Sequence, residues 1–134
     1  MSKKKPKIYN PIHLIEAIRK WPNPIIDKKH NYAIYLEEEA RTNQTRIQHI
    51  VRQDHNLKVR DLENVPNGIN DYFEYKADPV YKNTFNYYIT RKGEDKGFVK
   101  VSVEIDNQDK TKARLKTVFV TYEIKQILNS GSLI

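Results

Sequence analysis

Cysteine is absent from this chain of 134 residues, which excludes disulfides, thiolate nucleophiles and thiolate-rich zinc sites. The four histidines do not have zinc-finger spacing. Glycine is scarce, with four residues, and no glycine-rich phosphate loop, metalloprotease motif or nucleophile elbow occurs. Nothing in the sequence therefore requires a metal or any other cofactor.

Long apolar runs are also missing. No stretch approaches the roughly 18 consecutive apolar residues of a membrane span. The basic start "MSKKKPKIY" is not followed by the apolar segment of a signal peptide. We therefore expect a cytoplasmic protein without a membrane partner, and the length indicates one domain with a compact core.

Acidic residues are outnumbered, since 24 Lys and Arg stand against 17 Asp and Glu and give a net charge of +7. Such an excess favours polyanionic partners through phosphate contacts and counterion release. RNA or DNA is the first partner to consider, and a charge that serves only solubility is the alternative. The lysine-rich segment 1–7 offers nothing to bury and is predicted to be a disordered basic arm.

The N-terminal half predicts two helices. In "NPIHLIEAIRKW", Asn10 can cap a helix that ends before "PNP". The second helix begins after Thr42 or Asn43, and Ile47, Ile50 and Val51 form its apolar face. "NYAIYL" is consistent with a short strand or with a helix, and "NVPNGIND" is expected to be a loop.

From Tyr72 onward, apolar residues alternate with polar ones. The segments "YFEYK", "TFNYYITR", "FVKVSVEID" and "RLKTVFVTYEI" are separated by turn-rich stretches and predict a four-stranded antiparallel meander. The expected fold is α+β, with two N-terminal helices packed on a C-terminal four-stranded antiparallel sheet. A single domain would span residues 8–125, followed by a tail at 126–134. The valines of the last two strands should face the helices.

The opposite face of this sheet is expected to be open. It would combine a cation, a carboxylate, hydroxyls and aromatic rings, a mixture that can hold a nucleotide. With two arginines on the polar side of the second helix, the expected nucleic-acid-binding residues are Arg46, Arg52, Lys100, Tyr88, Phe119 and Thr117.

Two motifs carry a resemblance to a known family. "HIVRQDH" on the second helix and "KTVFVTYEIK" on the last strand make residues 43–125 resemble the phage-associated nucleases of the barnase, EndoU, colicin-tRNase and RelE-like group. His55 matches the histidine at the end of the group's helix, and Thr121 with Tyr122 approximates its terminal Thr-x-Tyr. The chain departs from the pattern because Gln53 and Asp54 stand where a basic residue usually precedes the histidine.

The resemblance implies a metal-independent ribonuclease, of toxin type or phage-encoded, with a cognate inhibitor protein as a possible partner. Such cleavage needs a base for the ribose 2′-hydroxyl, a cation for the phosphorane and an acid for the leaving oxygen. His55 is the first choice for the acid/base role, His49 the second, and Glu104 an alternative base. Thr121 would orient the phosphate or the 2′-hydroxyl.

Other functions remain open from the sequence alone. The same basic surface suits a noncatalytic nucleic-acid-binding module or a phage-encoded inhibitor of a host nucleic-acid enzyme. His49 suits an ordinary solvent-exposed position, and His55 suits a helix C-terminus, where the dipole favours it. A structural or immunity-type interaction protein is a further alternative.

Overall fold

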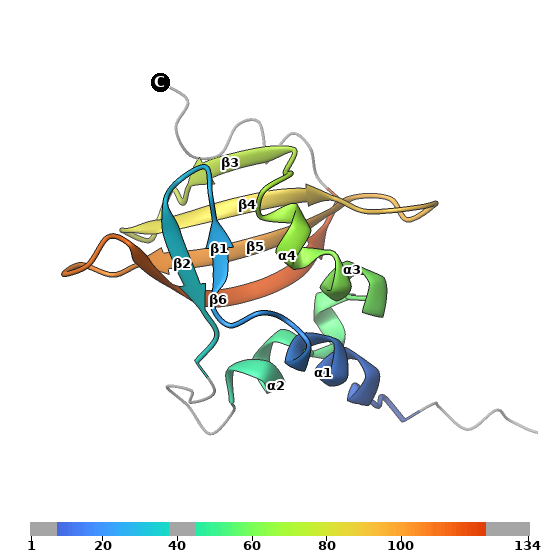
Figure 1. Ribbon diagram of the computed structural model, residues 1–134. Coiled ribbons are helices and arrows are strands. Elements are labelled where there is room, and N and C mark those ends of the chain that lie inside the picture. The colour runs from blue at the N-terminus through green and yellow to red at the C-terminus, as the bar shows by residue number, and fades with distance from the viewer. Residues whose placement is uncertain (1–7, 38–44, 123–134) are drawn as a thin grey trace, which may run out of the picture.

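The computed structural model describes residues 8–37 and 45–122, and Figure 1 shows short helices beside one curled sheet. The predicted arm at 1–7, the tail at 126–134 and the expected capping residues Thr42 and Asn43 lie outside the described residues. The helical segments are α1 (Ile12–Arg19), α2 (Arg46–Ile50), the 3-10 turn η1 (Gln53–His55), α3 (Val59–Glu63) and α4 (Val65–Gly68).

The sheet has six strands rather than four. They are β1 (Ile25–Asp27), β2 (Tyr32–Tyr35), β3 (Glu74–Ala77), β4 (Thr84–Thr90), β5 (Phe98–Ile105) and β6 (Lys112–Thr121). Their order is β1-β2-β6-β5-β4-β3, and β2 pairs parallel to β6 while every other neighbouring pair is antiparallel. The α+β class is confirmed, and the prediction of a four-stranded antiparallel sheet is wrong.

The four predicted strands form the meander β3 to β6, and the error comes from the N-terminal hairpin. "NYAIYL" forms β2, and its partner β1 is only three residues long. The hairpin joins the meander through β6, where the Ala33 amide donates to the Thr111 carbonyl at 2.8 Å. A parallel pairing between segments so far apart leaves no periodic signal in either segment.

The second helix begins later than expected and is short. Thr45 caps α2, accepting from the Gln48 amide, while the Gln48 side chain accepts from the Thr45 amide. Val51 ends the helix, and η1 follows before Asn56 adopts the left-handed conformation (φ 58°) that asparagine tolerates. This path turns His55 out of the helical register and back toward the sheet.

Helix α3 ends just before the region predicted to be loop, and α4 lies within that region. In α4, Pro66 fits the first turn because its missing amide has no partner to lose there. Gly68 lies against the Ile89 side chain, so close that a Cβ would meet Ile89 at 2.5 Å. The "NVPNGIND" loop prediction is therefore wrong for its first half, since Pro and Gly serve helix start and close packing there.

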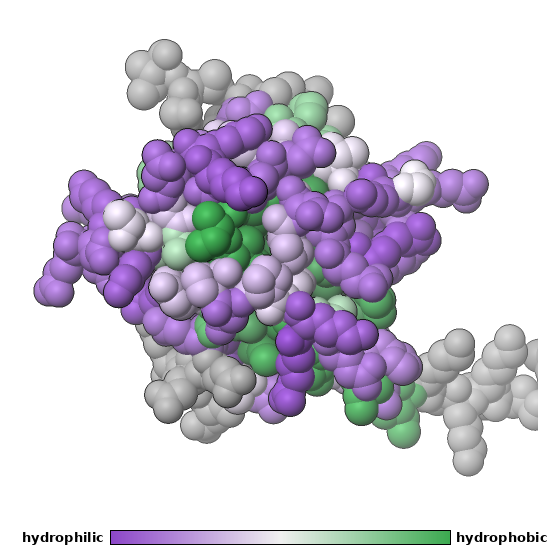
Figure 2. Space-filling view, in the orientation of Figure 1, coloured by the Kyte–Doolittle hydropathy of each residue, from purple (hydrophilic) through white to green (hydrophobic). Residues whose placement is uncertain are grey.

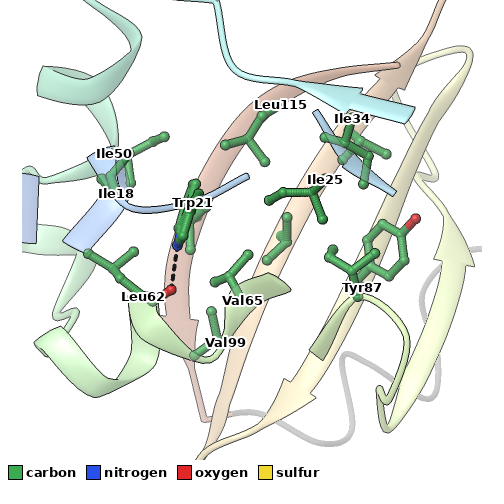
Figure 3. Packing of buried hydrophobic residues seen from close by; sticks show 14 of the residues in the cluster. Ile18, Trp21, Ile25, Ile34, Ile50, Leu62, Val65, Tyr87, Val99 and Leu115 are labelled. Atoms are coloured by element: carbon green, nitrogen blue, oxygen red, sulfur yellow. Dashed lines mark hydrogen bonds between the residues drawn. The ribbon is translucent and has the colours of Figure 1, made fainter. Parts of the chain in front are cut away.

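The core lies on the concave face of the sheet, where the helices and the β1–β2 hairpin cover it (Figure 3). Val101 is completely buried and Val120 is 7% exposed, which confirms that the valine faces of β5 and β6 turn inward. The Trp21 indole donates to the Leu62 carbonyl at 2.6 Å and ties the end of α1 to α3. The face that carries the hairpin is mostly hydrophilic, with a small apolar area over β1 and β2 (Figure 2).

Candidate functional site

The two histidines of "HIVRQDH" come together at the end of α2. The His49 and His55 rings lie edge to face, with their centroids 5.3 Å apart. His55 Nδ1 lies 2.8 Å from the Ile50 carbonyl oxygen, which can only accept, so Nδ1 carries the proton and donates. This bond fixes the ring and leaves Nε2 as the nitrogen that can exchange a proton.

His49 is partly buried, and its surroundings oppose its charged form. Burial lowers its pKa from the ordinary value, and His55, Arg46 and Arg52 lower it further by like-charge repulsion. Asp54 acts in the opposite direction and is the weaker influence. The neutral form of His49 is therefore favoured near neutral pH.

The histidine pair lies against the convex face of the sheet, opposite the core. The Phe119 ring of β6 is 5.9 Å from the His55 ring. Phe119 pairs with Lys100 of β5, which pairs with Tyr88 of β4, so these side chains form one row across three strands. The Lys100 ammonium lies 5.2 Å from the centre of the Phe119 ring and 5.9 Å from that of Tyr88. Burial lowers the pKa of Lys100.

The convex face is not open along its whole length, contrary to the sequence prediction. Tyr88 is 4% exposed, and Asn86 and Ser102 are also buried. Their polar atoms are satisfied within the face, because Ser102 donates to Asn86 at 2.6 Å and Asn86 donates to Asp78 at 3.0 Å. Tyr88 therefore presents no surface for a base in this structure, whereas Phe119 is only half-buried.

The two predicted arginines are both near the pair. The Arg46 guanidinium donates to the Lys116 carbonyl at 2.7 Å, which directs it toward β6. Arg52 forms an exposed, bidentate ion pair with Asp54, with N–O distances of 3.0 and 3.1 Å. Both influence the pKa of His49, so both positive charges are close to the histidines.

Glu104 and Thr121 do not converge. Thr121 lies opposite Phe98 at one end of β5, and Glu104 lies opposite Arg114 near the other end. At about 3.3 Å per residue, the two positions are about 20 Å apart. Glu104 is also bonded to the Arg114 guanidinium, and Lys116 lies 3.9 Å away. Thr121 and Thr117 share the strand face of Phe119, one on each side of it.

A second polar cluster was not anticipated from the sequence. The Asp27 carboxylate, which is fully buried, accepts from the Tyr87 hydroxyl and lies 2.7 Å from His30 Nδ1. The His30 ring stacks on Tyr75 at 3.9 Å, and the Tyr32 hydroxyl bonds to those of Tyr75 and Tyr87. Asp and His three positions apart in a hairpin turn were the available signal, but burial of the carboxylate depends on tertiary packing.

Comparisons with known proteins add no family to this picture. The chain matches no known protein-family model, and no curated protein or solved structure is significantly similar to it. Within residues 8–37 and 45–122, no three His, Asp or Glu side chains gather as a metal ion would require. In the same two stretches, every helix is too short or too polar to cross a membrane.

Proposed function

We propose that this protein is a metal-independent ribonuclease that cleaves RNA by acid/base transesterification at His49 and His55. The observation that carries the proposal is the pair itself, two imidazoles with centroids 5.3 Å apart, beside Phe119 and near two arginines. Such a pair supplies both proton transfers that the reaction requires. The basic net charge supports RNA as the substrate.

His49 suits the base, because its lowered pKa keeps it neutral near pH 7. It takes the proton of the ribose 2′-hydroxyl, and the 2′-oxygen then forms a bond to phosphorus. The bond from phosphorus to the 5′-oxygen breaks, and the leaving oxygen takes a proton from His55 Nε2. The products are a 2′,3′-cyclic phosphate and a free 5′-hydroxyl, with the net proton count unchanged.

The surroundings of the pair are consistent with His49 as the base and His55 as the acid. The bond to the Ile50 carbonyl keeps the Nδ1 proton in place when Nε2 gives up its own. Arg46 and Arg52 supply positive charge for the phosphorane, and the half-buried Phe119 ring offers a surface for one base. A cognate inhibitor protein, needed by any cell that makes an RNA-degrading toxin, belongs to the same proposal.

The test is cleavage of tRNA, mRNA and ribosomal RNA in a buffer with excess chelator. His55→Ala should lose about two to four orders of magnitude in rate and keep nearly unchanged RNA affinity, because the proton is transferred only in the transition state. His49→Ala should lose less, since water can accept the 2′ proton. The matched control is His13→Ala, because His13 is an exposed residue of α1, 77% exposed in its side chain.

Two results would contradict the nuclease proposal. One is a parent protein that cleaves no RNA class without metal, and the other is a His55→Ala protein that cleaves as fast as the parent. The His13→Ala control should match the parent in both rate and affinity. A loss in that variant would point to unfolding or to nonspecific charge effects.

The second candidate is a noncatalytic nucleic-acid-binding module or inhibitor of a nucleic-acid enzyme. The position of Glu104 favours it, because the one carboxylate predicted for catalysis is bonded to Arg114 and distant from Thr121. A binding module should tolerate His55→Ala but lose nucleic-acid affinity steeply between low and moderate salt. Affinity that does not depend on salt would instead point to a protein partner.

A further inference from the structure

The end of β4 borders a hollow of about 550 Å³ that lies outside the histidine pair and the Asp27 cluster described above. Strand β3 pairs with β4 only as far as Tyr88, so the last residues of β4 lack a neighbouring strand on that side. Helix α4 and the segment before β3 enclose the space instead. The volume lies within the range of small-molecule sites in proteins.

Two asparagines of this hollow have unused side-chain hydrogen-bonding groups. Asn64 and Asn67 line it, and neither side chain makes a hydrogen bond to another described residue. Thr90, also in the lining, is exposed. Because a side-chain amide both donates and accepts, it can pair with the edge of a nucleobase.

Aromatic rings, basic residues and the exposed carboxylate of Asp71 complete the lining. Phe73 is 49% exposed, and its ring packs on Phe98 with centroids 4.9 Å apart, which holds it in place. Tyr72 lines the same hollow. Lys92 is exposed and has no ion pair within the described stretches, so its charge is available to a phosphate. Arg91 is not, because it is bonded to Asp61.

The position of the hollow connects it to the histidine pair. Thr90 pairs with Phe98, and Phe98 pairs with Thr121, so the three form one row at the same end of the sheet. With strands about 4.8 Å apart, Thr90 and Thr121 are about 10 Å from each other. Phe119, which contacts His55, comes next on that face of β6. A stacked strand advances about 3.4 Å per nucleotide, so a few nucleotides bridge this distance.

We propose that the hollow at the end of β4 binds one nucleobase of the RNA strand, a few nucleotides from the bond that is cut. The amides of Asn64 and Asn67 read the edge of the base, the aromatic rings hold its face, and Lys92 binds the adjoining phosphate. This inference rests on the proposed ribonuclease function and deepens it, because it makes the hollow a determinant of substrate choice.

The first test compares cleavage of two substrates. Asn67→Ala and Lys92→Ala should each raise KM for a ten-nucleotide RNA about three- to tenfold with kcat unchanged, because the contact is present before and during the reaction. A dinucleoside monophosphate is too short to reach the hollow and should be cut equally by parent and variants. Gln108→Ala and Lys110→Ala are matched controls, because both residues are exposed in the β5–β6 turn at the other end of the sheet.

The second test measures binding without cleavage. In a His55→Ala background, Asn67→Ala and Lys92→Ala should weaken binding of the same fluorescently labelled ten-nucleotide RNA three- to tenfold, and the two controls should leave it unchanged. If the parent never cleaves RNA but this difference appears, the ribonuclease proposal fails and the base site stands. If the parent cleaves RNA, and Asn67→Ala and Lys92→Ala have the same KM and the same RNA affinity as the two controls, the base site is overturned.

Discussion

A buried ion pair fastens α3 to the end of β4 and offers the sharpest test of the fold. The Arg91 guanidinium donates to both carboxylate oxygens of Asp61, at 3.0 and 2.9 Å, and to the Lys96 carbonyl at 3.0 Å. The two side chains are 4% and 1% exposed. Asp61 also accepts from the Lys58 amide at the start of α3, so one carboxylate serves helix and sheet together.

Replacing Arg91 with methionine should be strongly destabilising. The Asp61 carboxylate would remain buried with the Lys58 amide as its main partner, and removing one member of a buried pair typically costs about 3–5 kcal/mol. Asp95, which lies 4.0 Å from Arg91, would lose a nearby positive charge as well. The double variant Arg91→Met/Asp61→Leu should recover much of this stability, because it leaves no unpaired buried charge. It should still lack about 1 kcal/mol, because Asp61 no longer accepts from the Lys58 amide at the start of α3.

Urea unfolding followed by circular dichroism measures both free energies. Lys92→Met, next in the chain and exposed, is the matched control and should change stability by less than about 0.5 kcal/mol. The reasoning fails if Arg91→Met costs less than about 1 kcal/mol. It also fails if the double variant is less stable than Arg91→Met alone, because the cost would then come from lost packing and not from the unpaired carboxylate.

Two further predictions follow from His49 and Gly68. The pKa of His49 is lower in the folded than in the unfolded chain, so at a pH between the two values the unfolded chain binds more protons. Stability should therefore fall as the pH drops through about 6.5. His49→Gln should flatten this dependence in urea midpoints measured from about pH 5 to 8. Gly68→Ala should cost about 1–3 kcal/mol, because the new methyl group meets the buried Ile89 side chain at 2.5 Å; an unchanged thermal midpoint would contradict this.

The meander and its inward face could be predicted because alternation is a local property. Val99, Val101 and Val103 alternate with polar residues, and that pattern alone directs them to the core. The hairpin could not be placed in the same way. β1 gains its position from pairing with β2, and β2 from pairing with β6, so their neighbours are set by contacts between distant segments.

The candidate site was predictable in part for a related reason. His49 and His55 approach each other because α2 ends at Ile50, earlier than the helix C-terminus that His55 was expected to occupy. The ring contact with Phe119 depends on where the chain leads after that end. The position of Glu104 depends on strand register, which its own alternation does not fix. The burial of Tyr88 likewise depends on what packs beside it.

The parallel pairing of β2 with β6 also bears on when the candidate site forms during synthesis of the chain. β6 follows all the other described elements in the chain, yet it lies in the interior of the sheet, between β2 and β5. Neither the hairpin nor the meander can take its final place until this strand has left the ribosome, since domains complete their folding as units. β6 also carries Phe119, against which His55 rests. A nascent chain that lacks β6 therefore has its histidines but not the surface that positions them, so the candidate site forms only after synthesis has passed residue 121.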